Sequence, residues 1–239
     1  MDPISLFAQV LHDARRHLKF NILEIGAREI HAEEEPFYRL LTLFPGSSIA
    51  AFEPDEALCA RQNETPRDGV TYFPFALGRT EETRAFYNTE DAMCSSLYKP
   101  DGEVLDRYNN MEVARVKTVS SVNTTSLDHF TSGHDLDFVD FIKIDIQGAE
   151  LDVFQGGTST LQNVLAIVTE AGFIEHYVDQ PLFGDVCSFL SQQQLQFQKI
   201  IGVGGRTLKP IVLNNDLNFC SQKMWAIYCL SDFCSARRN

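Results

Sequence analysis

The 239-residue chain lacks any run of roughly 20 uninterrupted apolar residues, the length that a membrane-spanning helix needs. Its opening residues, Met-Asp-Pro-Ile-Ser-Leu-Phe, lack the basic region and apolar core of a signal peptide. The six cysteines form no Cys-x-x-Cys pair and no zinc-ligand spacing, so we expect reduced thiols. These absences predict a cytoplasmic protein with no membrane segment.

Basic residues are also scarce. Twenty Lys and Arg stand against 33 Asp and Glu, and the formal net charge is −13. A surface that neutralises nucleic-acid phosphates needs the opposite balance, so we expect no nucleic acid as a partner. A small neutral or cationic ligand is compatible with this charge. The sequence shows no metal-ligand constellation, and no metal is predicted.

The hydrophobic pattern predicts an α/β fold, in which a mostly parallel sheet carries helices on both faces. Parallel strands are expected at 21–26, 48–53, 70–77, 138–145 and 164–170, with helices over 33–44, 54–63, 149–155 and 183–194. Two further strands follow at 197–203 and 224–230, and the final one is expected to pair antiparallel. We expect a single domain over 1–239 that begins with a helix over 5–18.

Residues 80–125 interrupt this alternation. They suggest a short strand at 83–87, an ordered loop at 94–98 and an edge strand at 113–122. We expect this insertion to lie over the top of the sheet, where loops that contact substrate are commonly carried.

The most informative stretch runs from Phe138 to Gly157, where an apolar strand ends at Asp145 and a Gln147-Gly148 turn leads into a helix. Lys143 and Asp145 share one face of this strand because side chains alternate with period two. Burial of these charges requires partners. An internal ion pair is one explanation. We favour an active site, because ligands bind beyond the carboxyl ends of strands in open α/β sheets.

Four predicted parallel strands end in or beside an acid: Glu24, Glu53, Asp145 and Glu170. If the strands are neighbours, the acids line one rim that repels phosphates. The first loop also lacks the G-x-G-x-x-G pattern and a Walker lysine, which disfavours a nucleoside triphosphate or an NAD-dependent oxidoreductase. S-adenosylmethionine carries an ammonium, a sulfonium and a ribose diol, and it suits such a rim.

Each part of this rim has a candidate role. Gly26 permits close approach to the methionine part of the cofactor, and Glu24 is expected to receive its ammonium. Glu53, beside Pro54, is expected to bind both ribose hydroxyls, while Ala76 and Leu77 flank the adenine. The alternatives are a helix-terminal charge for Glu53, an ion pair with Arg28 for Glu24, and a solvated strand-end charge for Glu170.

Six motifs in order resemble the FkbM-type S-adenosylmethionine-dependent methyltransferases, over about residues 21–195. They are Ile25-Gly26-Ala27, Ala51–Asp55, Ala76-Leu77-Gly78, Ser95-Ser96-Leu97, Thr125–Asp128 and Phe141–Glu150. The resemblance implies a class I methyltransferase (Rossmann-like) fold and cofactor contacts at Gly26, Ala27 and Glu53. It favours contact of Ser96 with the methyl end of the cofactor. It also implies transfer to oxygen, with a small-molecule or glycan hydroxyl as acceptor.

The first loop departs from the family pattern Asp-x-Gly-Ala-Asn-x-Gly, because Arg28 replaces the asparagine and Ile30 the second glycine. A β-branched residue is strained at positive φ, so this loop must follow a different path. Arg28 could pair with the cofactor carboxylate. The altered loop also keeps open a catalytically silent methyltransferase-like binding domain.

An oxygen acceptor must lose a proton, and a positioned carboxylate or histidine usually takes it. Asp145 is the first candidate for this acid and Glu170 the second, with Lys143 paired to one of them to keep it ionised. His176 and Tyr177 are candidates for the acceptor pocket. Methylation of nitrogen or of a protein side chain remains an alternative, and a homodimer is a base-rate expectation.

Overall fold

The structure is a computed structural model that describes residues 18–28, 35–134, 136, 138–211 and 221–231. The helix predicted over 5–18 lies outside the described residues, apart from Leu18. Ile30, the substituted glycine position of the first loop, lies outside them as well. No helix within the described ranges is long and apolar enough to cross a membrane.

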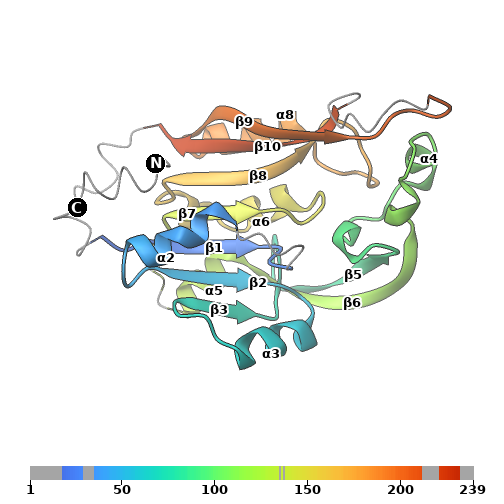
Figure 1. The fold of residues 1–239 in the computed structure, drawn as a ribbon. Helices are drawn as coiled ribbons and strands as arrows, with labels where there is room; N and C mark the ends of the chain where they lie inside the picture. The colour runs from blue at the N-terminus through green and yellow to red at the C-terminus, as the bar shows by residue number, and fades with distance from the viewer. Residues whose placement is uncertain (1–17, 29–34, 135, 137, 212–220, 232–239) are drawn as a thin grey trace.

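Seven strands form the central sheet in the order β3-β2-β1-β7-β8-β10-β9 (Figure 1). Their bounds are β1 Asn21–Ile25, β2 Ser48–Phe52, β3 Val70–Phe73, β7 Phe141–Ile144, β8 Ala166–Gly172, β9 Leu195–Gly205 and β10 Ser221–Leu230. Strand β10 pairs antiparallel with both of its neighbours, whereas β1, β2, β3, β7 and β8 pair in parallel. The predicted class I methyltransferase fold is confirmed, including its antiparallel final strand.

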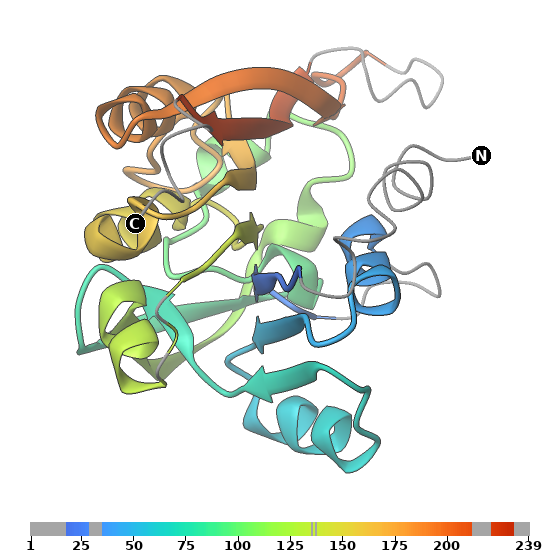
Figure 2. The same cartoon turned by 90° about the vertical axis from the view of Figure 1, so that its left-hand side faces the viewer.

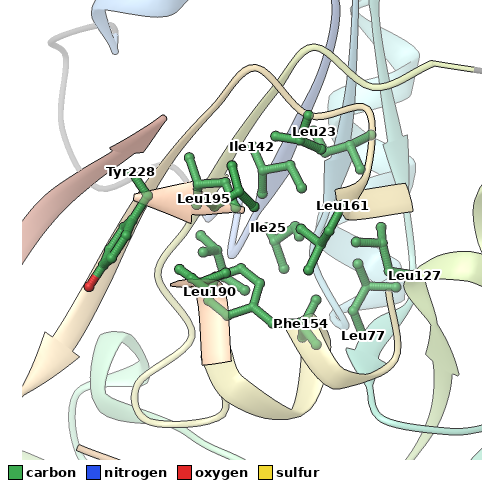
Figure 3. Close-up of a cluster of buried hydrophobic side chains, with 14 of the residues drawn as sticks. Leu23, Ile25, Leu77, Leu127, Ile142, Phe154, Leu161, Leu190, Leu195 and Tyr228 are labelled. Atoms are coloured by element: carbon green, nitrogen blue, oxygen red, sulfur yellow. The ribbon is translucent and has the colours of Figure 1, made fainter. Parts of the chain in front are cut away.

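Helices cover both faces of this sheet (Figure 2). One face carries η2 (Pro36–Tyr38) and α2 (Arg39–Leu43). The other carries α5 (Leu127–Gly133), α6 (Glu150–Gln155), α7 (Thr158–Leu161) and α8 (Phe183–Gln192), while α3 (Glu56–Glu64) packs beside β3. Side chains alternate along each strand, so the strands contribute apolar residues to a hydrophobic core on each face of the sheet. In β1, Ile22 packs with the η2 residues, and Leu23 and Ile25 join the larger cluster on the opposite face (Figure 3).

A second, three-stranded sheet has the order β4-β6-β5, formed by β4 (Ala76–Gly78), β5 (Glu82–Thr89) and β6 (Val116–Ser126). The single strand predicted over 70–77 is therefore wrong, because it divides between the two sheets. Pro74, between β3 and β4, has no N–H to donate to a strand ladder. The edge strand predicted over 113–122 begins later, at Val116, and up to Val122 it pairs only with β5, because β4 pairs with Thr124–Ser126.

The segment between β5 and β6 contains η3 (Ala92–Cys94), α4 (Gly102–Leu105) and η4 (Glu112–Ala114). Together with β5 and β6 it extends beyond the carboxyl ends of the parallel strands (Figure 1). The insertion thus lies at the end of the sheet where the sequence predicts a ligand site.

Candidate functional site

A pocket opens where β1, β2 and β7 end. Its empty space measures about 940 Å³, including the part open to solvent. The described loops after these strands and the second sheet contribute the lining residues, among them Gly26, Arg28, Glu53, Pro54, Asp55, Phe75, Ala76, Leu77, Phe86, Ser95 and Asp145. The structure therefore gathers seven of the predicted cofactor residues around one hollow.

Gly26 shapes the turn that closes the first strand. Its φ of +84° is a conformation that favours glycine, and a Cβ atom there would lie 2.1 Å from the carbonyl oxygen of Asp145. The backbone N–H groups of Gly26 and Ala27 both donate to the carbonyl oxygen of Phe52, at 3.1 and 2.9 Å. The turn thus joins β1, β2 and β7 at the pocket floor, while the Ala27 side chain is buried in the core beside η2.

Glu53 directly follows β2 and is buried in the pocket wall. The Arg28 guanidinium donates to both of its oxygens, from Nη2 to Oε1 at 3.0 Å and from Nε to Oε2 at 3.4 Å. The Asp55 backbone N–H donates to Oε1 at 3.0 Å. Asp55, and not Glu53, caps helix α3 by accepting from the Leu58 N–H. Glu53, which was predicted to bind the ribose, therefore lies in the pocket, but in this conformation its carboxylate is paired with Arg28.

Glu24 lies elsewhere. Its carboxylate is buried below the pocket and accepts a hydrogen bond of 2.5 Å from the Tyr38 hydroxyl. The ion pair of Glu24 with Arg28, the alternative raised from the sequence, does not form, because Arg28 extends toward Glu53 and Asp55. Burial raises the pKa of Tyr38 far above its ordinary value, and the charge of Glu24 acts in the same direction. Tyr38 therefore remains a hydrogen-bond donor to Glu24 at neutral pH.

Asp145 follows β7 and borders the pocket with its carboxylate held from two sides. Gln147 Nε2 donates to Oδ1 at 2.8 Å, and Trp225 Nε1 donates to Oδ2 at 3.1 Å. Glu150 closes the turn beneath it by accepting the backbone N–H groups of Ile146 and Gly148, at 2.9 and 3.0 Å. Burial raises the pKa of Glu150 to about 7, against the effect of these backbone bonds. Glu150 thus holds the loop that presents Asp145.

Glu170 lies within β8 and is buried, so the considered solvated charge at a strand end is wrong. Its Oε2 pairs with Nζ of Lys223 at 2.6 Å. Burial raises the pKa of Glu170 to about 8, and the charge of Asp145 acts in the same direction while Lys223 opposes it. A carboxyl group with this pKa exchanges protons near neutral pH.

The predicted ion pair of Lys143 with Asp145 or Glu170 is wrong. Within the described part of the chain Lys143 forms no ion pair, and the register places it beside Glu24 on β1. The reason is topological. Lys223 lies near the start of the antiparallel strand β10, opposite the end of β8, where it reaches Glu170 directly.

The remaining candidates lie next to the pocket and not in its wall. His176 is buried, and burial lowers its pKa to about 4, with the charge of Lys223 acting in the same direction, so it is neutral at pH 7. Tyr177 donates from its hydroxyl to the Cys94 carbonyl at 2.9 Å. Ser96 donates to the Gln147 carbonyl at 2.8 Å, and its neighbour Ser95 borders the pocket.

Sequence reasoning missed Gln147, Lys223 and Trp225. A usable signal was present, because the first residues of an antiparallel final strand lie at the edge where the parallel strands end. Metal-ligand geometry gives no further site. Among the residues that the structure describes, no three His, Cys, Asp or Glu side chains are grouped to hold a metal ion.

The pocket fits the predicted cofactor. The Gly26 turn gives close backbone access, Glu53 offers a carboxylate at the end of β2, and Pro54, Phe75 and Leu77 supply apolar surface for an adenine ring. A carboxylate has about four acceptor positions and Glu53 already has three donors, so one ribose hydroxyl fits beside them and the second takes the place of an Arg28 donor.

Comparison with known proteins agrees with this geometry. The model of the methyltransferase FkbM domain matches residues 24–198. The 2-O-methyltransferase NoeI of Sinorhizobium fredii (strain NBRC 101917 / NGR234) is 30% identical over 192 residues, which cover 78% of this chain and 77% of that protein. Methyltransferases of this family use S-adenosylmethionine, which confirms the predicted cofactor.

Two solved structures are similar at low sequence identity. The methyltransferase FkbM of Methylobacillus flagellatus KT has a TM-score of 0.45 and 14% identity, and the match covers 87% of this chain. This chain spans 44% of that protein's length. The N-terminal domain of EvdMO1 with bound SAH has a TM-score of 0.42 and 9% identity, over 96% of this chain and 82% of that one.

Proposed function

The chain belongs to the FkbM methyltransferase family, and we propose that it methylates a hydroxyl oxygen of a sugar or a sugar-containing natural product. The observation that carries this proposal is the Asp145 carboxylate, which faces the cofactor pocket and is held by two donors. The name of the 30% identical relative, a 2-O-methyltransferase, supports oxygen as the acceptor atom.

When bound, S-adenosylmethionine supplies a methyl group activated by its sulfonium. The chain's own residues bind and align the reactants, which is the main requirement of an in-line methyl transfer. Glu53 accepts the ribose hydroxyls, and the Gly26 turn admits the methionine part. Asp145 accepts the proton that the acceptor hydroxyl gives up. Glu170 is the second candidate for proton transfer on this side, and because burial raises its pKa to about 8 it carries its proton for most of the time at pH 7.

The test is a methyl-transfer assay with a panel of mono- and oligosaccharides, each paired with its 2-deoxy analogue. We expect a product heavier by one methyl group, with fragmentation that places the methyl on oxygen. Loss of the product with the 2-deoxy analogue would identify the 2-hydroxyl as the acceptor. Methyl found on nitrogen would overturn the choice of acceptor atom. Failure to bind S-adenosylmethionine in millimolar calorimetric titration would instead favour a silent binding domain.

A further inference from the structure

The only tryptophan of the chain, Trp225, lies beside the proposed catalytic acid, although 80 residues separate the two. Its strand, β10, runs next to β8 at the edge of the parallel region (Figure 1). The register pairs Trp225 with Glu170 on one side and with Gly202 on the other. Because β10 is antiparallel, its early residues meet the carboxyl ends of β7 and β8.

The indole ring has a fitted seat on β9. A Cβ atom added to Gly202 would lie 3.4 Å from Cε3 of the ring, and one added to Gly204 would lie 3.3 Å from Cη2. The distance at Gly204 is tighter than most Cβ contacts and that at Gly202 is at the limit of ordinary van der Waals contact, so the ring packs closely over both glycines. The Lys223 ammonium lies 5.3 Å from the ring centroid, within the range of a cation–π interaction. These contacts hold the ring in one orientation.

That orientation directs Nε1 toward Asp145. The N–H donates to Oδ2 at 3.1 Å, while Gln147 donates to the other oxygen at 2.8 Å. An indole N–H can only donate, so it fixes an acceptor oxygen at this point. Gln147 lies in a turn with φ of +58°, whereas Trp225 belongs to a strand that pairs on both sides. Trp225 therefore holds the carboxylate from the framework of the sheet.

We propose that Trp225 is a positioning residue, which holds the Asp145 carboxylate in line with the acceptor hydroxyl in the reaction proposed above. Lys223 and the glycines of β9 hold the indole, and the indole holds the acid. Misplacement of a reacting group by about 1 Å can lower the rate by a factor of roughly 100, so loss of this contact should lower kcat.

The first test uses the indole N–H resonance of the full chain labelled with nitrogen-15. Because Trp225 is the only tryptophan, the spectrum contains a single indole signal. We expect Asp145→Asn to move this signal strongly. The matched control Asp55→Asn lies at the cofactor end of the pocket and keeps a residue type that caps α3, and it should leave the signal in place. An indole signal unmoved by Asp145→Asn would overturn the proposal.

The second test is kinetic and uses an acceptor from the saccharide panel. Trp225→Phe keeps an aromatic ring and removes the donor, and we expect kcat to fall about 10- to 100-fold. The Kd for S-adenosylhomocysteine and the melting temperature should stay near those of the unmodified chain. Tyr228→Phe is the control. It also changes a side chain of β10 by removing a hydroxyl group, but this side chain lies in the hydrophobic core on the opposite face of the sheet.

These outcomes separate the two proposals. A kcat of Trp225→Phe within twofold of the unmodified enzyme would overturn the positioning role. Absence of oxygen methylation on every acceptor would overturn the proposed function, while an indole signal that responds to Asp145→Asn would still support the contact that positions the acid.

Discussion

The two halves of the candidate site are held together by interactions of different range. On the cofactor side, Arg28 and Glu53 follow neighbouring strands and stand 25 residues apart. On the acceptor side, Glu170 and Lys223 are 53 residues apart, and Asp145 and Trp225 are 80 apart. The cofactor half is assembled by adjacent loops, whereas the acceptor half forms only after β10 has joined the sheet.

Both contacts are half-buried, but their donors stand on different kinds of element. The Arg28 side chain is 32% exposed, so its ion pair with Glu53 is weakened by solvent and contributes about 1 kcal/mol or less. The Asp145–Trp225 contact lies against a paired strand. Glu53 on the cofactor side can therefore exchange Arg28 for a ligand, whereas Asp145 on the acceptor side is held in place by Trp225. Each prediction below tests one side of this contrast.

The largest effect is expected from Asp145→Asn. The variant removes the proton acceptor and keeps the size of the side chain, so kcat should fall about 100- to 10,000-fold. The Kd for S-adenosylmethionine, measured by calorimetry, should change less than about threefold. An equal loss of cofactor affinity would move Asp145 into the cofactor half and break the contrast.

Glu53→Ala should instead weaken the binding of the cofactor. The ribose hydroxyls lose a charged acceptor, and hydrogen bonds to charged groups contribute roughly 1.5–3 kcal/mol each, so the cofactor Kd should rise about 100-fold. Asp55→Asn borders the same pocket and keeps the α3 cap, and its Kd should stay within about twofold. An unchanged Kd in Glu53→Ala would remove Glu53 from the cofactor site.

Glu150→Gln tests the acceptor side through the pH dependence of the free energy of unfolding, because Glu150 holds the loop that carries Asp145. Burial raises the Glu150 pKa to about 7, above the ordinary value of 4.5, so the folded chain binds this proton more tightly than the unfolded chain. Its contribution to stability is complete below pH 4.5 and is lost as the pH rises through about 7. The free energy of unfolding of Glu150→Gln, relative to the unmodified chain, should increase by about 3 kcal/mol between these limits.

Urea unfolding at a series of pH values measures this difference, which isolates Glu150 because the opposing contribution of His176 is common to both chains. A difference that is flat with pH would mean that Glu150 does not hold its proton in the folded state.

The smallest effect is expected from Arg28→Asn. Removal of a partly exposed competitor for Glu53 should lower the cofactor Kd about 3- to 10-fold, which corresponds to roughly 1 kcal/mol. Arg61→Asn is the control, because it makes the same charge change on the exposed surface of α3. A higher Kd in Arg28→Asn would show that Arg28 binds the cofactor carboxylate, the role considered from the sequence.

Much of the cofactor half could be predicted because it depends on local patterns. An apolar strand followed by a glycine or an acid places Gly26, Glu53 and Asp145 at the carboxyl end of the sheet, whatever the rest of the chain does. The partner of each charge could not be predicted in this way. Arg28 was considered for Glu24 and for the cofactor, and Lys143 for Asp145 or Glu170, because alternation along a strand gives the face on which a side chain lies but not the partner that it meets there.

The sequence by itself determined the alternation of strands and helices in a mostly parallel α/β sheet, its antiparallel final strand and the edge at which the acids gather. These follow from hydrophobic periodicity and from the right-handed crossover between parallel strands. Only the tertiary structure decided that Lys223 contacts Glu170 and that Trp225 holds Asp145. Both depend on the pairing of β10 with β8, a contact between distant segments whose register is set by packing and not by either segment alone.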